Sequence, residues 1–317
     1  MTTLITGGMG FIGLHTAKAF VDAGEDVVIT WYQTWREPSF LKDEYNKRVK
    51  IEKADVSQGQ VIQDLAKKHN VDGIVHLAVP GLGALTPAED FHINMDGLIG
   101  VLEAARESGV KRLSLASSVA VYSNLPAGPF KETDRLPLES GNPTETFKKA
   151  WEILAGHYAQ RTGLEVINMR IGGIWGPLYH SMANLPSRLV HAAVKGTEAE
   201  YGGPRGGVPF REDTNDFCFV KDCAQGIRLV HLADKLEHKV YNIGSGQAAS
   251  AGQVHDAVLK HKPNAKLKIQ EGKGPRHRDN AYMDISRISG ELGYKPKYNV
   301  ESGIAENIAW LEAGNEK

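Results

Sequence analysis

The sequence predicts an α/β fold: a doubly wound parallel sheet with a smaller α/β lobe toward the C-terminal end. In the first half, short β-branched runs alternate with longer amphipathic stretches, as in parallel strands joined by covering helices. Glycines at positions 7, 10 and 13 mark the first strand-to-helix turn, where such sheets bind dinucleotides. With 317 residues, the chain can bury a substantial core.

The alternation places each element. We expect strands at residues 3–6, 26–30, 49–53, 73–77, 112–116 and 165–170, and helices at residues 11–23, 60–69, 90–108 and 144–162. Gly176 and Pro177 break this rhythm, after which a strand at 216–220 and a helix at 221–233 return to the first domain. The predicted domains are a cofactor-binding Rossmann domain, 1–174 with 215–240, and a substrate-binding lobe, 175–214 with 241–317.

Composition excludes several classes of function. Thirty-seven Lys and Arg balance 38 Asp and Glu, so no field of one sign favours nucleic acid or an anionic membrane. No stretch approaches the ~20 apolar residues of a membrane span, and no signal peptide is recognised. Cys218 and Cys223 form no Cys-x-x-Cys pair, and the histidines lack metal-ligand spacing. We expect a cytoplasmic protein without a metal.

The glycine loop carries the first functional prediction. Gly7, Gly10 and Gly13 follow a strand and open a helix. The turn is tight, the backbone must approach a pyrophosphate, and the helix packs closely on the strand, so each position favours glycine. The alternative is a plain strand-to-helix turn. The position of the triplet at the first turn favours dinucleotide binding.

The Gly-x-x-Gly-x-x-Gly spacing, with Phe11 and Ile12 inside it, resembles the extended short-chain dehydrogenase/reductases, the NAD-dependent epimerase/dehydratase superfamily. Further matches follow in the family's order, among them Asp55-Val56, His76-Leu77-Ala78, Ser117-Ser118, Tyr241 to Gly244 and Leu292 to Pro296. The resemblance implies NAD(P)-dependent oxidoreductase or epimerase activity. It implies these cofactor-binding residues: Gly7, Gly10, Phe11, Ile12, Gly13, Trp31, Arg36, Asp55, Val56, Leu77, Ala78, Asn94 and Lys148.

The end of the second strand bears on the choice of cofactor. NAD sites usually carry a carboxylate there, which accepts hydrogen bonds from the ribose diol. By resemblance this position is Trp31, so repulsion against a 2′-phosphate is removed, and Thr30, Gln33 and Arg36 can donate to one. Alternatively, Trp31 covers the adenine and Arg36 is a solvated surface charge. We expect NADP or NAD, and the missing carboxylate favours NADP.

The catalytic set departs from the family pattern at one member. The family uses a Ser or Thr, a Tyr and a Lys, the last two spaced Tyr-x-x-x-Lys so that they share a helix face. Ser118 and Lys148 fall on two of these positions, but Thr144 replaces the Tyr. A threonine hydroxyl is a far weaker acid than a phenol with a pKa near ~10, so it cannot serve as the usual acid/base.

Three interpretations of this departure stay open. Another group takes the proton, with Tyr122, Tyr179 and His180 as candidates. Alternatively, Lys148 relays the proton through the ribose hydroxyl, while Ser118 and Thr144 position a water or the substrate. In the third, catalysis is lost and the protein is a catalytically silent NAD(P)-binding sensor or interaction protein.

The substrate prediction also follows from departures. Sugar-nucleotide members usually carry an Asn at the position of Gly173, and galactose epimerases carry a Lys near Gly81 and Leu82. We therefore expect a small hydroxy or keto compound, such as a sugar acid, lactone or aromatic alcohol, in place of a nucleotide sugar. The predicted substrate-binding residues are Gly81, Leu82, Ser118, Trp175, Tyr179, His180 and Arg278. By resemblance, the helices near 90–108 and 144–162 form a homodimer interface.

Overall fold

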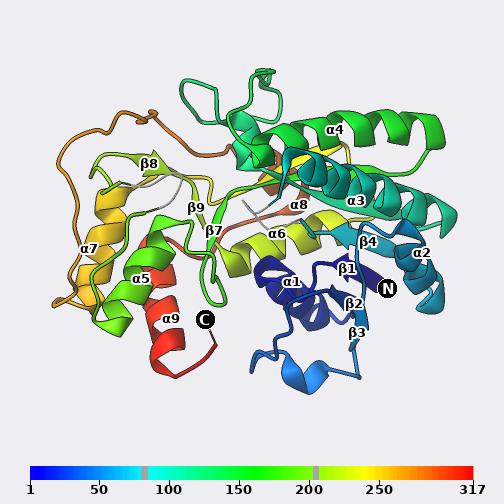
Figure 1. Cartoon of the computed structure of the whole chain (residues 1–317), viewed down its shortest axis with the longest axis horizontal. Helices are drawn as coiled ribbons and strands as arrows, with labels where there is room; N and C mark the ends of the chain where they lie inside the picture. The colour runs from blue at the N-terminus through cyan, green and yellow to red at the C-terminus, as the bar shows by residue number, and fades with distance from the viewer. Residues whose placement is uncertain (80–84, 203–206, 317) are drawn as a thin grey trace. The chain divides into compact units, whose positions relative to one another are not determined.

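The protein is described by a computed structural model covering residues 1–79, 85–202 and 207–316 (Figure 1). The chain divides into two compact units. Unit 1 comprises Met1–Ser123, Leu138–Arg170 and Ala224–Tyr241. Unit 2 comprises Asn124–Pro137, Ile171–Cys223 and Asn242–Lys317.

Unit 1 is built on a seven-stranded sheet with the order β10-β6-β5-β4-β1-β2-β3. The strands are β1 (Thr2–Thr6), β2 (Asp26–Trp31), β3 (Val49–Lys53), β4 (Gly73–His76), β5 (Arg112–Ser118), β6 (Val166–Ile171, in unit 1 to Arg170) and β10 (Val240–Ile243, in unit 1 to Tyr241). β1 pairs in parallel with both β2 and β4, so the strand order reverses between β1 and β4. The predicted doubly wound sheet is confirmed, and β10 is a strand that the alternation did not reveal.

Side-chain caps mark the starts of two of the helices of unit 1, α3 (Pro87–Glu107) and α4 (Pro143–Thr162). The others are α1 (Phe11–Asp22), α2 (Gly59–Lys68) and α6 (Val220–Leu232, in unit 1 from Ala224), with short 3-10 turns η1 (Lys42–Glu44) and η2 (Val119–Tyr122). Thr86 and Glu89 form a capping box that starts α3 before the expected residue 90. α4 begins after the N-cap Asn142 and ends at Gly163, whose φ is +75°.

Packing in unit 1 fixes the helices on the sheet. Leu4, Val28, Ile74 and Leu113, from four strands, are fully buried in one apolar cluster with residues of α2, α3 and α4. α2 and α3 cross closely at Gly59 and Gly100. A Cβ on Gly59 would lie only 2.6 Å from the Gly100 Cα, so the crossing requires glycine there. Within the described ranges, no helix is long and apolar enough to span a membrane.

Unit 2 holds the shorter elements. They are β7 (Gly173–Trp175), β8 (Thr214–Asn215), β9 (Phe217–Phe219), β11 (Ala249–Ser250), α5 (Leu185–Lys195), α7 (Ala251–His261), α8 (Ser286–Leu292) and α9 (Val300–Glu312). β9 pairs with β7 in a separate two-stranded sheet. The expectation that the 216–220 strand returns to the first domain is therefore wrong, whereas most of the following helix does return.

The segment Asn124–Pro137 also differs from the predicted boundaries, since it belongs to unit 2. Its Phe130 N–H donates to the Tyr282 carbonyl at 2.8 Å, and Asn242 Nδ2 donates to the Phe130 carbonyl at 3.0 Å. These are contacts between segments far apart in sequence, and strand periodicity carries no information about them.

We predict that Gly13→Ala destabilises the protein by about 1–3 kcal/mol, the usual range for overpacking. A Cβ at Gly13 would lie 2.3 Å from the Gly7 carbonyl oxygen, so the start of α1 must move. Gly156→Ala is the matched control: a Cβ there meets no atom within 4 Å, and helix propensity favours Ala by about 1 kcal/mol. Urea unfolding measures both variants, and a Gly13→Ala protein as stable as wild type contradicts the packing argument.

Candidate functional site

The carboxyl ends of five parallel strands bring most of the predicted cofactor residues together in unit 1. The glycine loop follows β1, Trp31 ends β2, Asp55 and Val56 follow β3, Leu77 and Ala78 follow β4, and Ser118 ends β5. The reversal of strand order between β1 and β4 lies in the middle of this set. Open α/β sheets bind ligands at such a reversal.

The glycine loop forms a backbone cradle. Gly7 has a φ of +67°, and a Cβ on it would lie 2.8 Å from the Ala78 nitrogen. Gly10 is the N-cap of α1 and makes no side-chain cap, so no side chain covers the positive end of the helix dipole. Backbone geometry of this kind fits the pyrophosphate of a dinucleotide.

The end of β2 carries aromatic rings in place of a carboxylate. Trp31 is half-buried and packs edge-to-face on Trp35, with ring centroids 5.4 Å apart. Lys53 Nζ lies 5.1 Å from the centroid of the Trp31 ring. Arg36 is only 8% exposed, so the alternative interpretation of Arg36 as a solvated surface charge is wrong. Lys53, which sequence reasoning missed, is the cation beside Trp31.

Two other predicted cofactor residues are held by local hydrogen bonds. Asp55 Oδ1 accepts from the backbone nitrogen of Ser57 at 3.0 Å and from its hydroxyl at 2.7 Å, which fixes the turn after β3. Asn94 is buried on α3, where its Nδ2 donates to the carbonyl and carboxylate oxygens of Asp90. The Asn94 amide therefore serves its own helix in this structure.

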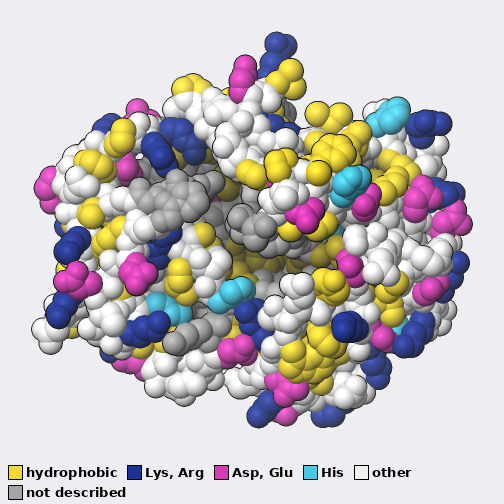
Figure 2. Space-filling view, in the orientation of Figure 1, with side chains coloured by type: hydrophobic (Ala, Val, Ile, Leu, Met, Phe, Trp, Pro, Cys, Tyr) yellow, Lys and Arg dark blue, Asp and Glu magenta, His cyan; other side chains and the backbone are white. Residues whose placement is uncertain are grey.

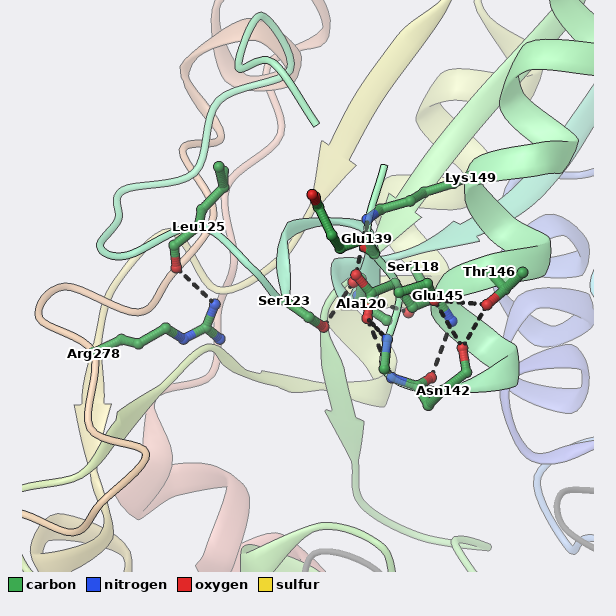
Figure 3. Close-up of polar contacts among 12 residues, drawn as sticks. Ser118, Ala120, Ser123, Leu125, Glu139, Asn142, Glu145, Thr146, Lys149 and Arg278 are labelled. Atoms are coloured by element: carbon green, nitrogen blue, oxygen red, sulfur yellow. Dashed lines mark hydrogen bonds and ion pairs between the residues drawn. The ribbon is translucent and has the colours of Figure 1, made fainter. Parts of the chain in front are cut away.

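The first turn of α4 is held by a buried ion pair (Figure 3). Asn142 Oδ1 accepts from the Glu145 nitrogen, and Lys149 Nζ donates to Glu145 Oε1 and to the Glu139 carbonyl, both at 2.8 Å. Glu145 and Lys149 each directly follow a predicted catalytic residue, Thr144 and Lys148. The ion pair thus fixes the backbone that carries the predicted catalytic pair.

Ser118, Thr144 and Lys148 come from two neighbouring elements of unit 1. Ser118 Oγ accepts from the Ala120 nitrogen at 3.1 Å and caps η2, which leaves its hydroxyl hydrogen to be donated (Figure 3). Thr144 and Lys148 are four residues apart on α4, so they share one helix face. Thr144 is half-buried.

Lys148 is the most perturbed member of this set. Its side chain is buried, and its Nζ has no hydrogen-bond partner within the described ranges. Burial lowers the pKa of Lys148 to about 7, against the opposing attraction of Glu152. That carboxylate is engaged elsewhere, because Arg170 Nη2 donates to it at 2.7 Å and Ser117 Oγ at 2.5 Å. Near neutral pH, the buried amine of Lys148 therefore populates both its protonated and its neutral form.

Of the candidates to replace the missing Tyr, Tyr122 has a structural role. It is fully buried, its hydroxyl accepts from Arg170 Nη1 at 2.7 Å, and the guanidinium lies 4.9 Å from its ring centroid. Nearby His76 is buried, and burial followed by the charge of Lys148 lowers its pKa to about 3. His76 is therefore neutral at pH 7, and the Tyr122 hydroxyl is engaged by Arg170.

The remaining predicted residues lie in unit 2 or outside the described residues. Trp175 is fully buried in the core of unit 2 against Phe219, so the expectation that it lines a substrate pocket is wrong. Tyr179 is half-buried and His180 exposed. Arg278 contacts the Leu125 carbonyl, also in unit 2 (Figure 3). Its guanidinium lies 4.9 Å from the centroid of the Phe130 ring in the same unit. Gly81 and Leu82 lie outside the described residues.

The sequence predicts no metal site, and the side-chain clusters of the structure bear on that prediction. Where the structure describes the chain, no group of three or more His, Cys, Asp or Glu is placed to hold a metal ion.

Comparison with known families agrees with this geometry. Residues 3–244 match the model of the NAD dependent epimerase/dehydratase family, more than half of the chain. The chain belongs to this family. The resemblance found in the sequence is thereby confirmed, and the protein is an NAD-dependent epimerase/dehydratase-like enzyme.

Individual relatives extend over the whole length. A UDP-glucose 4-epimerase of Lacticaseibacillus casei is 27% identical, covering 98% of this chain and 96% of its own. A dTDP-glucose 4,6-dehydratase of Actinoplanes sp. is 25% identical, covering 99% and 98%. The crystal structure of the UDP-glucose 4-epimerase of Thermotoga maritima with UDP-glucose has a TM-score of 0.83 at 21% identity, covering 99% of each chain. The structural likeness establishes the fold.

We predict that Lys148→Met stabilises the protein at pH 6 by about 1–3 kcal/mol. The folded-state pKa of Lys148 lies below its unfolded value, so the unfolded chain binds more protons between pH 7 and 10.5. The free energy of unfolding of the wild-type protein therefore rises with pH through that window. The difference in stability between Lys148→Met and wild type becomes smaller over the same range. Denaturant unfolding at several pH values measures this difference.

Lys149→Met is the matched control. It leaves the Glu145 carboxylate, which is 1% exposed, without its ion-pair partner, and is expected to destabilise the protein at pH 6. A Lys148→Met protein that is less stable than wild type at pH 6 contradicts the burial argument.

Proposed function

We propose that the protein catalyses NAD-dependent oxidation and reduction at a hydroxyl-bearing carbon of a small hydroxy or keto compound. In this proposal, Lys148 takes the proton that the Tyr takes in related enzymes. The observation that carries it is the Lys148 Nζ, buried, without a hydrogen-bond partner in the described residues and one helical turn from Thr144. Among the residues that the structure describes, such an amine has no hydrogen bond that holds it in one protonation state.

The residues at the carboxyl ends of the strands fit the cofactor. Gly7 and Gly10 leave the backbone room that a pyrophosphate needs, and Asp55 and Val56 follow β3 where the family holds the adenine. When bound, NAD accepts a hydride from the substrate carbon and can return it. The preference for NADP stays a prediction, supported by the absence of a carboxylate at Trp31 and by the cation of Lys53 beside it.

The proton balance assigns a role to each catalytic residue. The substrate hydroxyl gives its proton to the neutral amine of Lys148, and the resulting ammonium gives it back when the carbonyl is reduced. A general acid/base is most effective when its pKa lies near the working pH, which the value of about 7 for Lys148 meets. Ser118 donates its hydroxyl hydrogen to the reacting oxygen, and Thr144 orients it.

A substrate without a nucleotide is supported by the absence of an anion-binding amide. At Gly173, where sugar-nucleotide members carry Asn, an added Cβ would lie 2.7 Å from the Asp216 carbonyl oxygen. We therefore propose a sugar acid, lactone or aromatic alcohol. The names of the relatives favour a second candidate, a nucleotide sugar such as UDP-glucose or dTDP-glucose.

We predict that Lys148→Met lowers kcat at least ~100-fold, the range lost with a general acid/base. Wild-type protein with NAD or NADP is tested against sugar acids, lactones, aromatic alcohols and both nucleotide sugars, and the reduced cofactor is followed by absorbance. The wild-type kcat is expected to fall below about pH 7, where Lys148 is protonated and cannot accept the hydroxyl proton. Lys111→Met, at the opposite end of β5, is the control and keeps full turnover.

The competing outcomes are distinct. Normal turnover of Lys148→Met refutes the proton role. Turnover of UDP-glucose or dTDP-glucose alone refutes the non-nucleotide substrate. Stoichiometric cofactor binding without turnover of any compound favours the silent sensor over the enzyme.

We propose a homodimer as the assembly. α3 and α4 run side by side (Figure 1), and an apolar groove of about 480 Å³ lies on their surface. Ile99 is 49% exposed and Leu154 43% exposed, both lining this groove. An apolar helix pair is the surface that a second copy would cover by forming a four-helix interface.

The double variant Ile99→Lys with Leu154→Lys is predicted to be monomeric, because a dimer would bury both charges without partners. Light scattering after gel filtration measures the mass at micromolar concentration. Leu138→Lys, at a position 91% exposed and not among the residues that line the groove, is the control and stays dimeric. A monomeric wild type, or a dimeric double variant, contradicts the proposed interface.

Surface and redox features support the other expectations. Figure 2 shows basic and acidic side chains interspersed on the face in view, which favours a small-molecule partner over nucleic acid or an anionic membrane. Cys218 and Cys223 are both free thiols and buried, which supports a cytoplasmic location.

A further inference from the structure

Trp151 is the group that the structure places against the Lys148 amine. It lies three residues after Lys148 on α4 and is 3% exposed. Lys148 Nζ lies 3.8 Å from the centroid of its ring. A cation over the face of an indole is attracted by the ring quadrupole, and the attraction grows when both groups are removed from water.

The charged groups around Lys148 are engaged with other partners, so the Trp151 ring is the group that contacts its ammonium. Glu152, on the same helix, is paired with Arg170 of β6 and hydrogen-bonded to Ser117 of β5. His76, at the end of β4, is neutral at pH 7, because burial and then the charge of Lys148 lower its pKa to about 3. Lys149 is paired with Glu145. Among the described residues, no carboxylate is left within hydrogen-bond distance of Lys148 Nζ.

The indole is itself held in place by its neighbours. The His76 ring packs on Trp151 with centroids 5.4 Å apart and an interplanar angle of 37°. His76 Nδ1 and Thr6 Oγ1 are hydrogen-bonded at 2.7 Å, and Thr6 is the last residue of β1 before the glycine loop. A chain of contacts therefore runs from the glycine loop through His76 and Trp151 to Lys148.

We propose that Trp151 is a positioning residue for Lys148, whose indole face holds Nζ in the site and stabilises its protonated form. Without the ring, only the attraction of Glu152 opposes the effect of burial, so the amine holds a proton less tightly and no longer has a fixed place. The catalytic consequence rests on the proposed function of Lys148, whereas the contact itself does not.

Trp151→Leu and Trp151→Phe form the matched pair that tests this. The indole N–H makes no hydrogen bond in the described part of the chain, so Phe breaks none and keeps an aromatic face. Carbon-13 NMR of labelled lysines follows the Lys148 Cε signal against pH, assigned by its loss in Lys148→Met. We expect Trp151→Leu to lower the pKa of Lys148 by about one unit, and Trp151→Phe by less than half of that.

The outcomes separate this inference from the proposed function. A Lys148 that titrates in Trp151→Leu as in wild type overturns the role of Trp151, whatever the activity. If Lys148→Met keeps full turnover, the proposed function fails, and the titration still decides the contact. With an active enzyme, the acid limb of kcat is expected to move with the titration; an unmoved limb overturns the positioning role. Trp151→Met, whose unbranched side chain adapts to irregular space without a π face, replaces Trp151→Leu if that variant does not fold.

Discussion

The close backbone approach at the carboxyl end of β1 is the constraint on which the other features depend. Gly7 lies against Ala78 after β4, and Gly13 lies against Gly7 at the start of α1, both too close for a Cβ. These contacts fix β1, β4 and α1 relative to one another at the point where the strand order reverses. The cofactor cradle and the position of His76 at the end of β4 both follow from this packing.

A second constraint is electrostatic and concerns α4. The helix carries two consecutive lysines in different environments. Lys149 is paired with the Glu145 carboxylate, whereas Lys148 Nζ lies over the Trp151 ring. A buried ion pair holds the Lys149 ammonium against Glu145, whereas desolvation lowers the pKa of Lys148 to about 7 and makes its charge conditional. One lysine therefore fixes the start of the helix, and the other is free to exchange a proton.

Alternating periodicity was sufficient for six of the seven strands of the unit 1 sheet, because each of these strands and its covering helix is a local pattern, but it missed β10. It failed for residues 216–220 and for Asn124–Pro137, whose pairing with β7 and with Tyr282 depends on contacts distant in sequence. Motif order located Ser118, Thr144 and Lys148, but not Lys53 or Trp151, which belong to no motif. A Trp three residues after a predicted catalytic Lys was the available signal for Trp151, and only the structure shows that its ring faces the amine.

The loss of the phenol and the burial of Lys148 are best understood as one change. Where a Tyr is the acid/base, the Lys can stay protonated and act through its charge. With Thr144 in that place, a fully protonated lysine could not act as the base, so the proposed function requires an amine that loses its proton near pH 7. Burial supplies that shift, and in our proposal Trp151 limits it, since an amine that never held the proton could not return it to the substrate. Retaining Lys148 without the Tyr is then consistent with catalysis and unexplained by cofactor binding alone.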